Sequence, residues 1–139
     1  MGDDPKPTGQ PAKRVTLFYP YNYTVAWEYD PSQANYRRFT AGAPHVDQAT
    51  GQQLHGTNVV VLFMRNWFIG RDDQQDFQIT GIGRALFFLD GKVVEGKWTR
   101  ASLSQPTYYW NAAGECVTLN SGGTTWIQVV PADAKVTVE

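Results

Sequence analysis

Both histidines of this 139-residue chain lie in one polar stretch, between Tyr36 and Asn58. His45 and Asp47 are two residues apart, so on an extended chain their side chains project from the same face. A carboxylate placed there could orient the imidazole as a general base. The simpler interpretation is a hydrogen-bonded pair that stabilises the loop. We favour it because no nucleophile or pair of carboxylates lies nearby to complete an active site.

Metal and nucleotide chemistry find little support in the sequence. Adding His55 to His45 and Asp47 gives at most a two-histidine, one-carboxylate set. The motifs G-x-S-x-G, C-x-x-C and H-E-x-x-H are absent. The stretch Gly91–Trp98 follows the Walker A spacing until Trp98 takes the place of the magnesium-binding Ser or Thr. We therefore predict no catalytic residues, no metal and no cofactor.

The side chains that could contact a ligand are polar groups of the same stretch and one tryptophan. The polar groups would orient a ligand, and the indole would offer a stacking surface. For the indole we favour a second interpretation, in which it covers a strand glycine and stabilises the sheet. The candidate ligand-binding residues are Tyr36, Arg38, His45, Asp47, Asn58 and Trp98.

The composition indicates which elements must position these residues. Aromatic residues make up 14% of the chain, and charged residues make up only 18%. Short apolar runs alternate with turn signals roughly every 8–12 residues, a spacing typical of β-sandwiches and barrels. We predict an all-β, mainly antiparallel fold, either a barrel or a sandwich, with about 8–11 short strands. The predicted strands are Arg14–Tyr19, Thr24–Tyr29, Tyr36–Thr40, Asn58–Arg65, Phe77–Thr80, Arg84–Leu89, Lys92–Trp98, Thr107–Trp110, Glu115–Leu119, Thr125–Val130 and Lys135–Val138.

The clearest local feature is the dipeptide Asp90-Gly91, which favours a two-residue type I′ hairpin. This turn fixes the register, so that Leu89 faces Lys92 and the glycine at position 83 faces the tryptophan at position 98. We expect strand 58–65 to be central, because a strand buried on both faces reads as a continuous apolar run. We also expect strand 107–110 to pair with 115–119 and strand 125–130 to pair with 135–138. A turn is expected at Pro20–Asn22.

Cys116 is the only cysteine, which excludes an intrachain disulfide. Its predicted position in the middle of a strand favours a small buried side chain.

The remaining features bound the domain organisation and the partners. Residues 1–13 contain three prolines and two glycines and no apolar run, which predicts a flexible leader or linker before a single β domain at 14–139. A net charge of −1 provides no field to attract nucleic acid. The longest apolar run, Val59–Met64, is far shorter than the about 20 residues of a transmembrane helix.

Several short motifs, taken in order along the chain, resemble those of one protein family. They are Trp27-x-Tyr29-Asp30, Tyr36-x-Arg38, Gly42-x-Pro44-His45-x-Asp47, Asn58-Val-Val-Val61, Thr80-Gly-x-Gly83, Asp90-Gly-Lys-Val-x-Glu95-Gly96-x-Trp98 and Gly123-x-Thr125-Trp126. Together they resemble the C-terminal domain of the YerB-like family, described as bacterial lipoproteins of unknown function. The resemblance extends over roughly Val15–Val138.

The resemblance implies a location on the outer face of the bacterial membrane or in the cell wall. It also implies an N-terminal companion domain, with residues 1–13 as the linker to it. It transfers no catalytic residue.

Three functions remain open from the sequence. The leading hypothesis is a non-enzymatic cell-envelope module that binds a glycan, a cell-wall peptide or a protein partner. The second is a hydrolase of envelope polymers that uses His45 and Asp47. The third is a structural domain that packs on the N-terminal companion domain.

Overall fold

The computed structural model describes residues 9–19, 23–68 and 75–139, and the side chains of residues 66–68, 75 and 76 are not described. The predicted turn Pro20–Asn22 and the first eight residues of the predicted leader lie outside the described residues. Within them the chain forms fourteen strands, several only two or three residues long.

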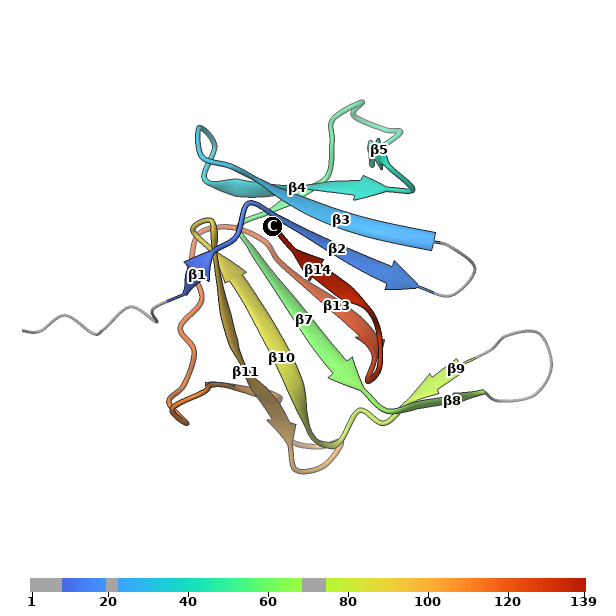
Figure 1. Cartoon of the computed structure of the whole chain (residues 1–139), viewed down its shortest axis with the longest axis vertical. Helices are drawn as coiled ribbons and strands as arrows, with labels where there is room; N and C mark the ends of the chain where they lie inside the picture. The colour runs from blue at the N-terminus through green and yellow to red at the C-terminus, as the bar shows by residue number, and fades with distance from the viewer. Residues whose placement is uncertain (1–8, 20–22, 69–74) are drawn as a thin grey trace, which may run out of the picture.

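The strands form two packed sheets and one small ribbon (Figure 1). The first sheet has the order β1 (Gln10–Pro11), β11 (Lys92–Arg100), β10 (Gly81–Leu89), β7 (Asn58–Met64) and β13 (Thr125–Pro131), and β12 (Tyr108–Asn111) also pairs with β11. The second sheet has the order β14 (Val136–Val138), β2 (Arg14–Tyr19), β3 (Tyr23–Asp30), β4 (Asn35–Thr40) and β5 (Ala43–Pro44), and β6 (His55–Gly56) pairs with β4. The ribbon joins β8 (Asn66–Phe68) and β9 (Gln75–Phe77).

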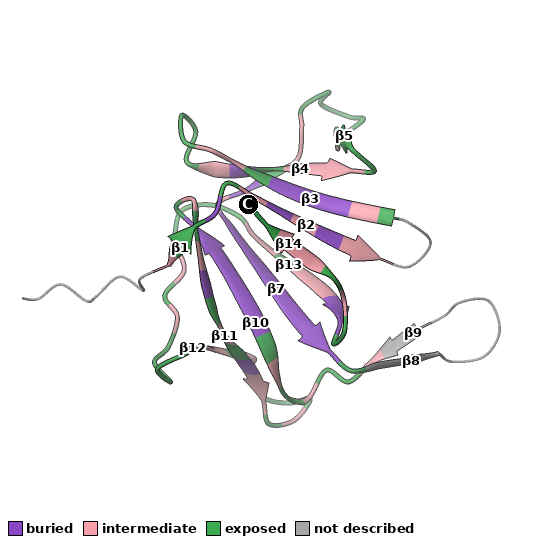
Figure 2. Ribbon diagram, in the orientation of Figure 1, coloured by how far each residue is buried: buried purple, intermediate pink, exposed green. Residues whose placement is uncertain are grey.

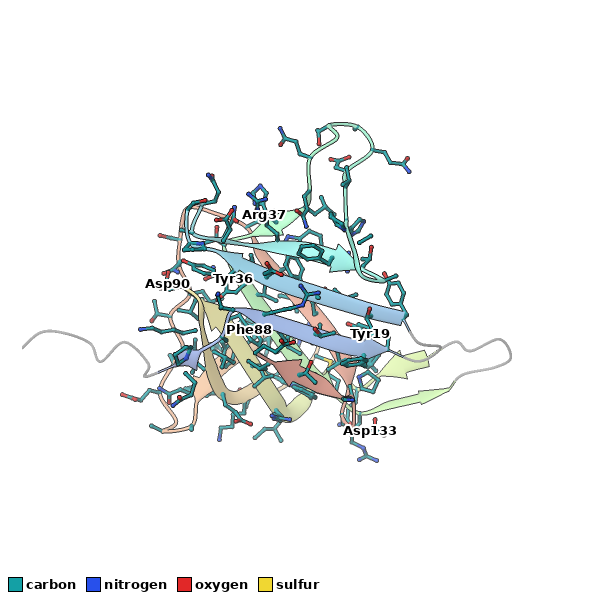
Figure 3. The ribbon with its side chains drawn as sticks, turned by 45° about the horizontal axis from the view of Figure 1, so that its top comes forward. Tyr19, Tyr36, Arg37, Phe88, Asp90 and Asp133 are labelled. Atoms are coloured by element: carbon teal, nitrogen blue, oxygen red, sulfur yellow. The ribbon has the colours of Figure 1, made fainter. Side chains whose placement is uncertain are left out.

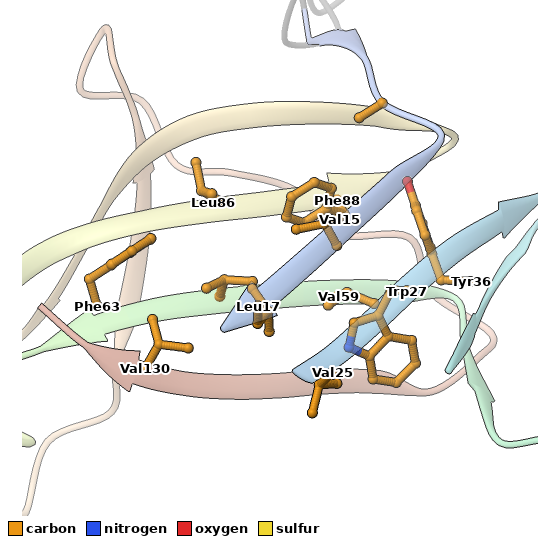
Figure 4. Close-up of a cluster of buried hydrophobic side chains, with 12 residues drawn as sticks. Val15, Leu17, Val25, Trp27, Tyr36, Val59, Phe63, Leu86, Phe88 and Val130 are labelled. Atoms are coloured by element: carbon orange, nitrogen blue, oxygen red, sulfur yellow. The ribbon is translucent and has the colours of Figure 1, made fainter. Parts of the chain in front are cut away.

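The fold is therefore all-β and sandwich-like. Of the two architectures that the sequence predicted, a barrel and a sandwich, the structure has the sandwich. Among the ladders of the described residues, only β7–β13 is parallel. The main core lies between the two sheets, where β2 directs Val15 and Leu17 toward Leu86 and Phe88 of β10 (Figure 4).

The first sheet is covered on its outer face as well. Alternate residues of β7 and β10, together with Trp98 of β11, form a second buried cluster there. The 108–119 segment covers that cluster with Tyr109, Val117 and Leu119. Because both faces of β7 are covered, all seven of its residues are buried (Figure 2). The prediction of a central strand at this position is confirmed.

The Asp90-Gly91 hairpin is also confirmed. Both residues have positive φ, 53° and 74°. The register places Leu89 opposite Lys92 and Gly83 opposite Trp98, as the two-residue turn predicts.

Several sequence-based expectations were wrong. The predicted strand Glu115–Leu119 forms only one isolated bridge, and of the predicted strand Phe77–Thr80 only Phe77 lies in a strand. Strand 125–130 does not pair with 135–138, because β13 pairs with β7 in the first sheet and β14 pairs with β2 in the second. The turn after Pro131 carries the chain across the sandwich, so that Val130 and Val136 contribute to the same core from opposite sheets. Cys116 is exposed rather than buried. It forms only an isolated bridge with Trp110. The next residue, Val117, points to the other side and packs on the second cluster.

The described part of the predicted leader packs on the domain. Gln10–Pro11 pair with β11, and Ala12 is 1% exposed in the main core.

Candidate functional site

The Arg38 side chain joins the two sheets. It projects from β4, and its guanidinium carbon lies 5.7 Å from the Trp27 ring centroid and 5.3 Å from that of Trp126 on β13. Its Nη2 donates to Gln128 Oε1 at 3.3 Å, and the Trp27 Nε1 donates to the same oxygen at 3.2 Å. We call these four residues the closed seam, because they fill the side where β3 and β4 meet β13.

His45 contacts this seam through Arg38. Nη1 of Arg38 lies within hydrogen-bond distance of His45 Nδ1. A guanidinium can only donate, so Nδ1 is the acceptor and the neutral ring carries its proton on Nε2. The lone pair that a general base would need at Nδ1 is therefore occupied by Arg38.

Asp47 forms hydrogen bonds within the turn that follows it. Its Oδ1 accepts a hydrogen bond from the Ala49 backbone N–H at 2.9 Å, and its carbonyl accepts one from Gly51 at 2.7 Å. The polar contact of the His45 ring is with Arg38, and that of the Asp47 carboxylate is with the turn. The expected His45–Asp47 pair is therefore not formed among the described contacts, although Asp47 still stabilises its turn.

Tyr36, Asn58 and Trp98 are buried, with exposed fractions of 1%, 0% and 2%. The Tyr36 hydroxyl accepts a hydrogen bond from the Gly91 N–H at 2.9 Å and so holds the hairpin, which lies beside it in Figure 3. Burial raises the pKa of this hydroxyl well above its usual range.

The other two buried residues also bond within the protein. Asn58 Nδ2 donates to the Asn120 carbonyl at 2.8 Å and its Oδ1 accepts from the Asn120 N–H at 3.1 Å, which fixes the segment that covers the second cluster. Trp98 covers Gly83, where an added Cβ would lie 2.4 Å from the indole nitrogen. That nitrogen donates to the Phe63 carbonyl at 2.9 Å.

Of the six predicted residues, the structure thus brings Arg38 and His45 into direct contact and uses the other four separately. A feature that sequence reasoning missed lies on the opposite side of the sandwich. There a groove of about 700 Å³ opens between β14 and the inner faces of β10 and β11. We call this cavity the groove. The apolar residues that line it are Leu86, Val93, Val94, Val136 and Val138, with Gln10, Pro11 and the 111–115 turn at its ends.

One wall of the groove is an unpaired strand edge. Arg14 and Glu139 exchange both backbone hydrogen bonds, at 3.1 and 2.8 Å. Antiparallel pairs alternate, so Thr137 also points its backbone groups toward β2. The N–H and C=O groups of Val136 and Val138 therefore face the free edge, and within the described residues no strand pairs with that edge.

The rim of the groove carries three charged side chains. Arg84 Nε lies 2.9 Å from Glu95 Oε1, so these two charges compensate each other. Glu115 Oε1 accepts a hydrogen bond from Asn111 Nδ2 at 3.2 Å, and no described cation forms an ion pair with it. The groove therefore has a net negative rim.

Two kinds of feature are absent from the described residues. No three His, Cys, Asp or Glu side chains come together as metal ligands. No helix there has the length and apolar character needed to cross a bilayer.

Comparison with known proteins places the chain in a family. Residues 15–127 match the model of a C-terminal domain described as a protein of unknown function, DUF3048. The chain belongs to this family. The DUF3048 C-terminal match covers the motifs from Trp27 to Trp126.

A curated protein is also similar in sequence. The protein named "Putative lipoprotein YerB" from Bacillus subtilis (strain 168) is 25% identical over 114 residues, which are 77% of this chain and 31% of the relative. The crystal structure of the YerB protein from Bacillus subtilis matches with a TM-score of 0.76 at 23% identity, and it covers 94% of this chain and 45% of that one. It supports the sandwich fold. The DUF3048 domain described here spans less than half the length of these relatives.

Many of the motif residues of this DUF3048 domain are those that join its sheets. Trp27, Arg38 and Trp126 form the closed seam. Tyr36 holds the hairpin at Gly91. The residues that carry the resemblance therefore specify the scaffold, and the groove lies largely outside them.

Proposed function

We propose that this chain is a non-enzymatic interaction module of a bacterial extracytoplasmic protein and that the groove is its binding surface. The observation that carries the proposal is the groove itself. Its volume of about 700 Å³ lies within the range of ligand sites. Its floor is apolar and its few polar groups lie at the rim, which is the usual division between affinity and orientation.

The proposed location and ligand class follow from the relatives. The Bacillus subtilis relative is named as a lipoprotein, which supports attachment outside the cytoplasm for this chain as well. The ligand would then be a component of the cell envelope: a cell-wall peptide, a glycan or another protein. In this proposal Tyr36, Asn58 and Trp98 position the scaffold, and Arg38 and His45 close its other side.

The non-enzymatic proposal is supported by how the two candidate catalytic groups are used. The His45 Nδ1 accepts from Arg38, and the Asp47 carboxylate accepts from its own turn. A hydrolase that used this pair would need the carboxylate to orient the imidazole.

The binding test uses purified peptidoglycan and a glycan array. Val138→Arg would place a charged side chain in the groove from a residue that is 39% exposed. Ile127→Arg is the matched control, because Ile127 is 51% exposed and does not line the groove. We expect envelope material to bind the unmodified chain and the Ile127 variant. We expect the Val138 variant to lose this binding. Blank results with the unmodified chain, or equal binding by both variants, would contradict the proposal.

A second candidate function is packing on an N-terminal companion domain. Two large apolar side chains, Ile82 and Leu103, are 66% and 68% exposed near the start of β10 and the end of β11. The family model is that of a C-terminal domain, and this chain covers only 31% of the curated relative. Maleimide labelling of Leu103→Cys, in a Cys116→Ser background, would be slower in a polypeptide that carries the N-terminal domain than in this chain alone. Equal labelling rates would exclude that interface.

A further inference from the structure

We infer that the groove binds its ligand by β-strand addition, and that the ligand is an extended peptide with alternating apolar residues and one basic side chain. This inference rests on the proposed function, because it concerns the same groove. It names the chemical class of the ligand and the atoms that hold it.

The free edge of β14 supplies the backbone contacts. Val136 and Val138 direct their N–H and C=O groups away from β2. An extended peptide beside this edge would satisfy both pairs of groups and continue the second sheet by one strand. A glycan cannot do this, because it lacks the regular alternation of N–H and C=O groups along a backbone.

The groove floor supplies the side-chain contacts. Val136 and Val138 pair with Leu17 and Val15, whose side chains face the main core, so the two valines face inward as well. An added strand has the same two-residue period. Every second side chain of the ligand would therefore point toward Leu86 on the floor, and the others would point to solvent.

The dimensions of the groove limit the length of the ligand. β14 has three residues, which at about 3.4 Å per residue span about 10 Å. A peptide of about five or six residues would cover this edge and reach the rim at both ends. This estimate is consistent with a cavity of about 700 Å³.

The rim supplies the charge preference. Glu95 is already paired with Arg84, whereas Glu115 has an amide as its partner. A lysine or arginine at one end of the ligand would pair with Glu115. An acidic side chain at that position would be repelled.

The test uses a fluorescein-labelled peptide of the sequence Lys-Val-Thr-Val-Thr-Val amide, with binding followed by fluorescence polarisation. Val138→Pro removes one N–H from the free edge and leaves the bonds of Thr137 and Glu139 to β2 in place. We expect its Kd to rise about tenfold, the effect of losing one buried hydrogen bond. Glu115→Gln should raise Kd about threefold, and Glu28→Gln, on the outer face of the second sheet, should leave it unchanged.

A peptide methylated on alternate backbone amides provides a test that leaves the protein unaltered. Of the two possible methylation patterns, the one that blocks the amides facing β14 should abolish binding and the other should preserve it. Equal binding of both methylated peptides, or unchanged binding by Val138→Pro, would overturn strand addition.

The outcomes separate this inference from the proposed function. If the peptide does not bind but peptidoglycan binding is still lost in Val138→Arg, strand addition is wrong and the groove remains the binding surface. If neither the peptide nor envelope material binds, both proposals fail.

Discussion

The two sides on which the sheets meet are filled differently. On the closed seam, Arg38 lies against Trp27 and Trp126, and two donors converge on Gln128. On the other side, β14 stops short of β10 and β11 and leaves the groove. The closed seam has aromatic and charged groups that satisfy one another, whereas the groove has apolar side chains and a strand edge without partners.

This difference shows that the most distinctive residues of a sequence need not be its binding residues. Tryptophan, arginine and histidine attract attention because they are common in binding sites. Here Trp27, Arg38 and Trp126 hold two sheets together. The groove is lined by valine and leucine together with polar and small residues, and of its lining residues only Val93 and Glu95 belong to the motifs.

The largest expected effect comes from removing the centre of the closed seam. Trp27→Ala should lower the free energy of unfolding by about 3–5 kcal/mol, because Trp27 is 0% exposed and its loss leaves a cavity. Urea denaturation measures this value. Ile127→Ala, at an exposed position on the neighbouring sheet, should change it by less than about 0.5 kcal/mol. Similar losses in both variants would remove the distinction between the seam and the surface.

Replacing the cation of the seam should have a smaller effect. Arg38→Met loses the contacts with two indole rings and the bond to Gln128, and we expect a loss of about 2 kcal/mol. The buried Nε of Arg38 has no hydrogen-bond partner among the described residues, which limits the net contribution of the arginine. The control is Arg37→Met. This variant loses the ion pair of Arg37 with Asp30 at the surface, and we expect the free energy of unfolding to fall by less than about 1 kcal/mol.

Alkaline pH should weaken the contacts between the sheets. Burial raises the pKa of Tyr19, whose hydroxyl donates to the Val129 carbonyl, to about 12. The unfolded chain loses this proton near pH 10, so the stabilisation is complete below pH 10 and is lost as the pH rises toward about 12. Denaturation curves between pH 8 and about 12 should show a steady fall that is reduced in Tyr19→Phe. An identical pH profile in that variant would assign the fall to other groups.

The smallest effect on stability is expected in the groove. Val138→Thr is nearly isosteric and lies at a 39% exposed position, so it should change stability by less than about 0.5 kcal/mol. The same substitution at Val130, which is 0% exposed in the main core, should cost about 1–3 kcal/mol because the hydroxyl is buried. Thermal denaturation compares the two. A large loss at position 138 would show that the groove is part of the core.

Features that depend on near neighbours in the sequence were predicted well. The Asp90-Gly91 turn fixed the β10–β11 register because two residues with positive φ determine how the strands align. The continuous apolar run of β7 predicted a strand covered on both faces. Local turn signals also gave close bounds for β2 and β4, whereas the predicted strand Glu115–Leu119 did not form.

Features that depend on distant residues were not predicted. The pairing of 125–130 with 135–138 was wrong because two strands close in sequence can also join opposite sheets through one turn. The same limit applies to the candidate site. Trp27 and Gln128 are 101 residues apart, and no local pattern shows that they meet.

The sequence by itself therefore determined the all-β class, the family and most of the strands, because hydrophobic periodicity, turn chemistry and motif order are local properties. Only the tertiary structure decided what the chemically distinctive residues do. It placed Arg38 between two tryptophans and directed Asp47 to its own turn. Within the described residues it also left one edge of β14 without a paired strand, and the order of strands in a sheet is set by distant parts of the chain.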